Sequence, residues 1–403
     1  MFAPAGHISS APKKRTCAGW LPGVIGLALI AQTSIPAYAN ENTPTTPDPT
    51  PSPIADLKQC NPKDYLLNLL PSDVSDGLDI NGWFWFSYLH ASQEKSDFTD
   101  TLFSLDITKS FQQRLALSFE GNVMNVDGQW RGEVEQLYLS LMVCPESQTL
   151  LTIGKFNANF GLEARDFWNR THGTTSLLFA AQPQDLVGFM ITQPLGDTGL
   201  KLRPFMSLDF QGQFEYNQSP STGIQAEYKP TRNLRMSLTA WVGPGFVMEA
   251  GRSLRHPFPQ GGYEEGSAKA IENWQGPNLI AERGGTLYFT DANVSWHATD
   301  ELVVGAEFLA GTSGTSAGRW GWCGAMLTAD FHVTDKLNLF ARGSYVDDSA
   351  WLIYGERQRL FEGSGGAGYQ VTKNIEIRGE YRHDYGTNTG SADSLSIHVT
   401  LGF

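Results

Sequence analysis

The chain ends in the stretch DSLSIHVTLGF, residues 393–403, which alternates strictly in character. From Leu395 onward each odd-numbered residue is apolar and each even-numbered residue is small or polar, and the chain stops at Phe403. A β-strand with this period places the two sets on opposite faces. A tilted strand of about ten residues is long enough to cross a bilayer. The stretch therefore predicts a two-faced strand of either a membrane barrel or a soluble sandwich.

The same period recurs through most of the chain. From Asp79 onward it predicts about sixteen strands, at residues 79–89, 98–108, 113–124, 134–143, 148–156, 183–194, 200–209, 221–229, 233–242, 284–297, 301–311, 320–333, 336–347, 361–371, 374–384 and 393–403. Short turns alternate with longer loops, which include residues 125–133, 157–182, 243–283 and 312–319. Such asymmetry is typical of outer-membrane barrels, which have tight periplasmic turns and long extracellular loops. We therefore predict an all-β fold, a transmembrane antiparallel β-barrel of about sixteen strands.

The N-terminus has the pattern of a secretory signal. Lys13, Lys14 and Arg15 precede an apolar stretch at residues 20–35, and the tripeptide 37–39, Ala-Tyr-Ala, fits a cleavage site. We expect a signal peptide at 1–39, a proline-rich linker and short periplasmic helix at 40–78, and an outer-membrane barrel at 79–403. Beyond the signal no apolar run approaches the roughly 20 residues of a spanning helix. A membrane form of this chain must then be a closed barrel, because lipid leaves no partner for open backbone groups.

Charge and composition narrow the function classes. The full chain has a net charge of -13, and because the first 39 residues carry three cations and no acids, the mature chain would carry -16. This charge argues against nucleic acid as a partner. The mean hydropathy of -0.26 is too polar for a helical membrane protein. The 42 glycines and the 12% of aromatic residues suit barrel turns and interfacial aromatic girdles.

The alternation also assigns charged side chains to a face. An Arg or Lys facing lipid at mid-depth would cost about 2–4 kcal/mol, so the strand charges are expected to face inward. A barrel of sixteen strands is too wide for its own side chains to fill and leaves an aqueous channel. The alternative for each residue is a salt bridge that only stiffens the wall. The predicted pore-lining residues are Arg114, Glu120, Lys201, Arg203, Glu227, Arg235, Arg342, Glu376, Arg378, Glu380 and Arg382.

Two of the long loops differ from the others in composition. Loop 157–182 combines Glu163, Arg165, Asp166 and Arg170 with three aromatic residues in its first half. It could fold into the barrel and narrow it, or it could cover the barrel from outside. Loop 243–283 is the longest and is rich in glycine, proline and charge, which is typical of a surface feature.

Three motifs in the first half of the barrel region resemble a known family. They are VEQLYL at 134–139, GKFNANFGLE at 154–163, and SLLF at 176–179 followed by Gln-Pro at 182–183. Together they resemble the porin-2 family of outer-membrane β-barrels, the OmpL-like porins. The resemblance implies a porin-like outer-membrane channel with no catalytic residues to carry over. The segment 162–170 is more charged than the family pattern, so the resemblance predicts no particular solute.

Other chemistry is weakly represented. The sequence has no G-x-S-x-G, H-E-x-x-H or Walker motif and no D-x-D-x-D-G calcium loop, so we predict no catalytic residue, metal or cofactor. His332 and His383 lack a nucleophile motif beside them. Because the periplasm is oxidising, we expect a disulfide between Cys60 and Cys144, with Cys323 unpaired; the alternative is two independent thiols.

The sequence thus predicts a porin for passive diffusion of small hydrophilic solutes or ions. Its expected partners are outer-membrane lipids and the solutes themselves, with no nucleic acid, and a homotrimer would suit a barrel of this width. Two other functions remain open. The barrel could anchor a structural or adhesion protein that displays loop 243–283, or it could be an outer-membrane hydrolase.

Overall fold

A computed structural model describes the chain from residue 76 to residue 403, with gaps at 92–96, 112–113, 127–128, 159, 164–166, 209–219, 249–278, 316–317, 349–357 and 388–389. The predicted signal peptide and the predicted linker and helix, up to residue 75, lie outside the described residues.

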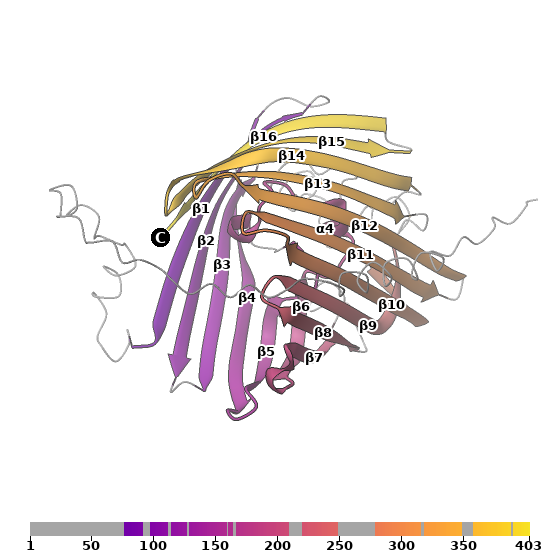
Figure 1. Cartoon of the computed structure of the whole chain (residues 1–403). Coiled ribbons are helices and arrows are strands. Elements are labelled where there is room, and N and C mark those ends of the chain that lie inside the picture. The colour runs from indigo at the N-terminus through magenta and orange to yellow at the C-terminus, as the bar shows by residue number, and fades with distance from the viewer. Residues whose placement is uncertain are drawn as a thin grey trace, which may run out of the picture. The chain divides into compact units, whose positions relative to one another are not determined.

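Within the described residues the chain forms a closed antiparallel barrel of sixteen strands (Figure 1). Each strand pairs with its neighbours in the sequence, and β1 pairs with β16 to close the sheet. The strands are β1 (Leu78–Ala91), β2 (Asp97–Phe111), β3 (Leu115–Val126), β4 (Gln129–Cys144), β5 (Thr149–Asn157), β6 (Asp185–Pro194), β7 (Leu200–Ser207), β8 (Ser221–Thr231), β9 (Leu234–Met248), β10 (Leu279–His297), β11 (Leu302–Thr315), β12 (Gly318–His332), β13 (Leu337–Asp348), β14 (Gln358–Thr372), β15 (Ile375–Gly386) and β16 (Gly390–Gly402). The predicted fold class is confirmed, and each predicted strand corresponds to an observed one.

Two of the connections that the sequence predicts to be long contain only two residues each. Residues 125–133 and 312–319 were expected to be long loops, but β3 ends at Val126 with β4 beginning at Gln129, and β11 ends at Thr315 with β12 beginning at Gly318. The ladders continue to these last residues, which pair with each other across the hairpin. Such continuation satisfies the backbone groups as the strands extend. The alternation of loop lengths is therefore less regular than the sequence indicates.

The two faces of the wall follow the predicted alternation. On β16, Leu395 and Ile397 are 48% and 45% exposed, whereas Ser396 and His398 are buried. The outward positions of the other strands carry a band of exposed apolar side chains, including Leu117, Leu139, Ile153, Leu238, Leu327, Leu339 and Ile377. An apolar band around the whole barrel is what a hydrocarbon environment requires. Separately, no helix in the described part of the chain has the length and apolar character to cross a bilayer.

The chain end closes the seam between β1 and β16. The Gly82 amide donates to the Phe403 carbonyl at 3.3 Å, and the Phe403 amide donates to the Gly82 carbonyl at 3.0 Å. The Phe403 ring lies over Gly82, where a Cβ would come within 2.0 Å of the ring. An aromatic ring over a strand glycine covers backbone that would otherwise be open. The terminal aromatic residue therefore packs against the first strand of the barrel.

The interior is less polar than the sequence predicts. Leu287, Phe289 and Leu309 point inward from β10 and β11, and they are buried together with Leu177 and Leu178 of a short helix, α4 (Leu177–Ala180). This helix lies in the connection between β5 and β6, and it contacts β12, β13 and β14. Part of the inner face is therefore apolar, because that part of the wall packs against a segment of the chain.

Candidate functional site

Residues 158, 160–163 and 167–184 of the connection between β5 and β6 lie inside the barrel, and we call them the inner segment. It contains a 3-10 turn, η3 (Phe167–Asn169), and helix α4. Asn293 of β10 donates to the Phe160 carbonyl at 2.6 Å, and the Trp322 indole of β12 donates to the Ala181 carbonyl at 3.0 Å. The ring of Trp168 stacks on Trp83 of β1, with centroids 5.2 Å apart. Of the two positions predicted for this loop, the structure shows the one within the barrel.

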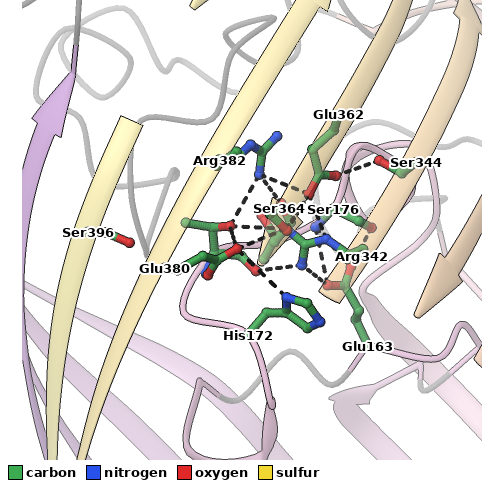
Figure 2. Close-up of polar contacts among 12 residues, drawn as sticks. Glu163, His172, Ser176, Arg342, Ser344, Glu362, Ser364, Glu380, Arg382 and Ser396 are labelled. Carbon is green, nitrogen blue, oxygen red and sulfur yellow. Dashed lines mark hydrogen bonds and ion pairs between the residues drawn. The ribbon is translucent and has the colours of Figure 1, made fainter. Parts of the chain in front are cut away.

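Arg342 of β13 joins the inner segment to the wall (Figure 2). Its guanidinium lies 2.7 Å from a Glu163 oxygen and 2.6 Å from a Glu362 oxygen, and 3.6 Å from a Glu380 oxygen. It also donates to the Thr174 carbonyl at 2.8 Å. A bidentate guanidinium suits such a site because its planar fork reaches several acceptors at once.

Arg382 of β15 makes a second set of contacts beside the first. It donates to Asp384 at 2.7 and 2.8 Å and to the Thr175 carbonyl at 2.5 Å. Next to it, Glu380 accepts from the Thr174 amide at 2.9 Å and from the Thr174 hydroxyl at 2.8 Å. These bonds hold the backbone of residues 174–175 against β15.

Local sequence explains why the inner segment turns where it does. Ser176 is the N-cap of α4, and its hydroxyl accepts from the Phe179 amide at 3.1 Å. Serine is a preferred N-cap because its oxygen satisfies an amide that has no partner within the helix. Glu163 accepts from the Ser176 amide at 3.0 Å, which links the two arms of the segment. The same carboxylate pairs with Arg342, so the cap and the wall contact depend on each other.

The predicted pore-lining residues Arg342, Glu380 and Arg382 are thus brought together, but beneath the inner segment. Their side chains have almost no exposed area. They lie on the inward face, as the alternation predicts, yet they contact protein and not a lumen. Buried charges are tolerated when they are paired and hydrogen-bonded, as these are. Their role in the structure is to hold the inner segment.

A second charged group is formed by β7, β8 and β9. Glu227 is buried, and its carboxylate lies 3.9 Å from Lys201, 3.6 Å from Arg203, 3.8 Å from Lys229 and 2.8 Å from Arg235. Of these, Lys201, Lys229 and Arg235 have side chains 42%, 51% and 48% exposed. Four of the residues were predicted from the alternation, and Lys229 was not. We call this group the Glu227 cluster.

The remaining predicted lining residues are dispersed. Arg114 is exposed and precedes β3 in a turn, so it lies outside the strands. Glu120 is buried and accepts from Ser104 of β2 at 3.4 Å. Glu376 and Arg378 pair with each other on β15 at 2.7 Å. These four residues belong neither to the Glu227 cluster nor to the group formed by Arg342, Glu380 and Arg382.

Of the four residues predicted to form a constriction, two are described by the structure and two are not. Glu163 pairs with Arg342, and Arg170 is buried with its guanidinium 5.4 Å from the centroid of the Phe179 ring. Arg165 and Asp166 lie outside the described residues.

Several residues of the site were not singled out by the sequence. Glu362 and Asp384 lie on inward positions of β14 and β15, and Glu307 of β11 accepts from the Leu162 amide at 2.6 Å. The alternation places each of them on the polar face of its strand, which was the available signal. Asp384 pairs with Arg382 two residues away on β15, and Glu362 pairs with Arg342 of β13, whereas Glu307 and Leu162 are 145 residues apart. Spacing along the chain gives no sign of such a pairing.

The predicted disulfide is not formed. Cys144 is a free thiol at the end of β4, and its sulfur lies 3.2 Å from a Glu146 carboxylate oxygen in the adjacent turn. Cys60 lies outside the described residues. Cys323, which was expected to be unpaired, is disulfide-bonded. The prediction was wrong because position in a predicted turn does not fix which way a thiol points.

The two histidines considered for catalysis each lie near an aspartate, and the His332 ring is 4.0 Å from the Asp330 carboxylate. His383 and Asp393 are both exposed, and the His383 ring lies 2.8 Å from the Asp393 carboxylate. In the part of the chain that the structure describes, no other side chain is hydrogen-bonded to His383. Over the same residues, no three His, Cys, Asp or Glu side chains gather as metal ligands would.

The chain matches a known protein family over most of the barrel. The family described as "Putative beta-barrel porin-2, OmpL-like" matches residues 100–400. The chain belongs to the porin-2 family. The match covers β3 to β15 entirely and nearly all of β2 and β16. This porin-2 chain is therefore an outer-membrane β-barrel. No curated protein matches it.

Solved structures share the fold of this porin-2 barrel at low sequence identity. A loop L8 deletion mutant of OmpT, an outer membrane protein of Vibrio cholerae, has a TM-score of 0.56 at 12% identity and covers 81% of this chain and 99% of its own. A trimer form of OmpT has a TM-score of 0.52 at 11% identity with the same coverage. An anion-selective porin from Comamonas acidovorans has a TM-score of 0.55 at 9% identity, also with 81% and 99% coverage.

Proposed function

We propose that this porin-2 barrel is an outer-membrane porin, through which small hydrophilic solutes or ions diffuse passively. The observation that carries the proposal is the inner segment, which is held inside the barrel by buried ion pairs. A barrel of sixteen strands is wide enough for water, and a segment fixed within it sets the width of the passage. We assign the protein no catalytic step and no cofactor.

The contacts of the inner segment support a fixed constriction. Arg342 and Arg382 join it to β13 and β15, whereas Trp322 and Asn293 join it to β12 and β10. Breaking a buried ion pair by removing one partner costs about 3–5 kcal/mol. With several such contacts at once, the segment stays in place as solutes pass. A porin of this kind selects by size and charge without needing a gate.

The charged groups that remain exposed support a wet passage. Lys201, Lys229 and Arg235 reach from inward positions of β7, β8 and β9 and keep about half of their side-chain area exposed. Charged side chains on the inner wall of a barrel hold water there and shape the field that an ion meets. This property favours a channel over a barrel that serves only as an anchor.

Liposome swelling tests this proposal. Vesicles containing the folded full chain are diluted into isotonic solutions of sugars of increasing size. We expect swelling with the smallest sugars and a cutoff at larger ones, since the inner segment narrows the lumen. Folding is checked by the mobility shift on heating that barrels show in detergent gels. Vesicles with folded protein that swell no faster than empty vesicles would rule the proposal out.

Export and assembly belong to the same proposal. We propose that residues 1–39 direct export and are removed, which N-terminal sequencing of the membrane form would show as a start at Asn40. We also propose a homotrimer, which has a precedent in the trimer form of the Vibrio cholerae OmpT structure. Light scattering of the detergent-purified protein tests it, and a mass equal to one chain plus detergent would contradict it.

A further inference from the structure

The Glu227 cluster lies at one end of the barrel. Lys201 and Arg235 are the second residues of β7 and β9, and Lys229 lies two residues before the end of β8. All three positions adjoin the short turns 195–199 and 232–233. We call this end, where the short connections lie, the turn end of the barrel. The cluster is thus placed at a mouth of the barrel and not beneath the inner segment.

Charge in this cluster is not balanced. Four cations surround the single carboxylate of Glu227, at 2.8 to 3.9 Å, which leaves three positive charges. Arg203 is the most buried of the cations, and it also donates to Gln225 at 2.7 Å. The buried carboxylate with Arg203 forms the fixed base of the site. The three other cations have exposed area available for a ligand.

Two carboxylates lie on other strands at the same end of the barrel. Asp330 of β12 and Glu376 of β15 are inward-facing and partly exposed at the same end of the barrel. Glu376 is paired with Arg378, and Asp330 accepts from Thr171 of the inner segment at 3.1 Å. In the closed order of sixteen strands, β12 and β15 lie four and seven strands from β8. A solute at this mouth therefore meets a cationic side on β7–β9 and a side with carboxylates elsewhere.

We propose that Lys201, Arg203, Lys229 and Arg235 form a binding site for the oxyanion group, carboxylate or phosphate, of small anionic solutes. The inference rests on the proposed porin function, whose solute class it specifies. Guanidinium and ammonium groups are the side chains that bind carboxylate and phosphate through charge-assisted hydrogen bonds. Glu227 holds the cations at the wall, and the three charges that it leaves uncompensated attract an anion into the mouth.

The test removes the exposed cations and keeps the base of the site. A triple variant, Lys201→Gln, Lys229→Gln and Arg235→Gln, leaves Glu227 and Arg203 in place. Each of the three side chains is at least two-fifths exposed, so glutamine is accommodated without a buried vacancy. Current is measured through the reconstituted full chain in a planar bilayer under a KCl gradient, first alone and then with inorganic phosphate as the anionic probe.

A matched control removes the same charge from the same end of the barrel. Arg232, Lys336 and Lys373 are exposed cations in the short turns, outside the strands. The triple variant Arg232→Gln, Lys336→Gln and Lys373→Gln has the same net charge as the test variant. Only the test variant loses cations from the Glu227 cluster. A difference between the two variants therefore reports the cluster and not the total charge.

The expected effect follows from screened Coulomb attraction. Three unit charges about 8 Å from an anion in water, with screening at about 0.1 M salt, change its local concentration roughly threefold. We expect the unaltered protein to prefer chloride over potassium, and phosphate to reduce the chloride current. In the test variant the preference falls about threefold and the block by phosphate is lost, while the control variant keeps both. At about 1 M salt the difference disappears, because the screening length falls to about 3 Å.

The outcomes separate the two proposals. A folded protein that carries no current fails as a porin. If the protein conducts but prefers cations, or if the two triple variants behave alike, the oxyanion site is refuted while the porin remains. If chloride is preferred but phosphate does not block, the cluster steers anions without binding an oxyanion, and the binding site proposed here is wrong.

Discussion

Replacing Arg342 with alanine should release the inner segment from the barrel wall. The guanidinium is fully buried and contacts the carboxylates of Glu163, Glu362 and Glu380, together with the carbonyl of Thr174. Removing the guanidinium takes away most of the positive charge that offsets the burial of these carboxylates. Loss of one partner from a buried ionic group costs about 3–5 kcal/mol. Because two of the four partners belong to the inner segment, much of that cost should appear as weaker docking of the segment.

Limited proteolysis measures this docking directly. The peptide bond after Arg170 is a trypsin site, and the Arg170 side chain is buried in the docked segment. Cleavage requires the segment to open, so its rate follows the open population when closing is fast. A loss of about 3–5 kcal/mol corresponds to cleavage at this bond that is faster by roughly two to three and a half orders of magnitude. Mass spectrometry of the folded protein in detergent identifies the fragment that ends at Arg170.

Arg359→Ala is the matched control for this prediction. Arg359 lies on the neighbouring strand β14, where its side chain is 45% exposed and pairs with Asp347 at 3.3 Å. An exposed pair of this kind contributes less than about 1 kcal/mol. Cleavage after Arg170 should therefore be nearly unchanged in this variant. Equal cleavage rates in the Arg342→Ala and Arg359→Ala variants would refute the reasoning that buried pairing holds the segment.

Three further predictions concern the barrel wall. Gly82→Val should destabilise the barrel by about 1–3 kcal/mol, because the valine side chain would overlap the Phe403 ring. Adding Phe403→Ala should recover part of this loss. If the effects of the two substitutions on thermal unfolding are strictly additive, the contact is contradicted. Leu327→Arg, in the middle of the lipid face of β12, should lower the free energy of unfolding by about 2–4 kcal/mol. Val333→Arg in the adjoining turn should lower it by only about 0–1 kcal/mol. Similar unfolding midpoints of the two variants in vesicles would contradict the placement of the membrane. Cys144 should react with a maleimide without prior reduction, and labelling only after reduction would show that it is oxidised.

The strand pattern was accessible from the sequence because it depends on local period. Leu395, Ile397, Ser396 and His398 show why, since a face is assigned by counting along one strand. Lipid makes the rule strict, because a misplaced charge is costly there. The same counting placed Arg342 and Arg382 on the inner face.

The position of the inner segment was not accessible in this way. Its composition suits either a cover or a constriction, and what decides is pairing over long distances in the chain, such as Glu163 with Arg342, which are 179 residues apart. One signal was present. At Leu287, Tyr288 and Phe289 both faces of β10 are apolar, which a strand facing only water inside would not need. Those inward side chains pack against the inner segment.

Single-channel recording on the purified full chain tests the central claim most directly. An apolar-walled barrel with a fixed inner segment should insert into a planar bilayer in discrete events. Each event should add the same conductance, and the current through it should vary linearly with voltage, because the segment does not leave its place. Folded protein that enters the bilayer and leaves it sealed would contradict the account, since the barrel would then be closed to ions.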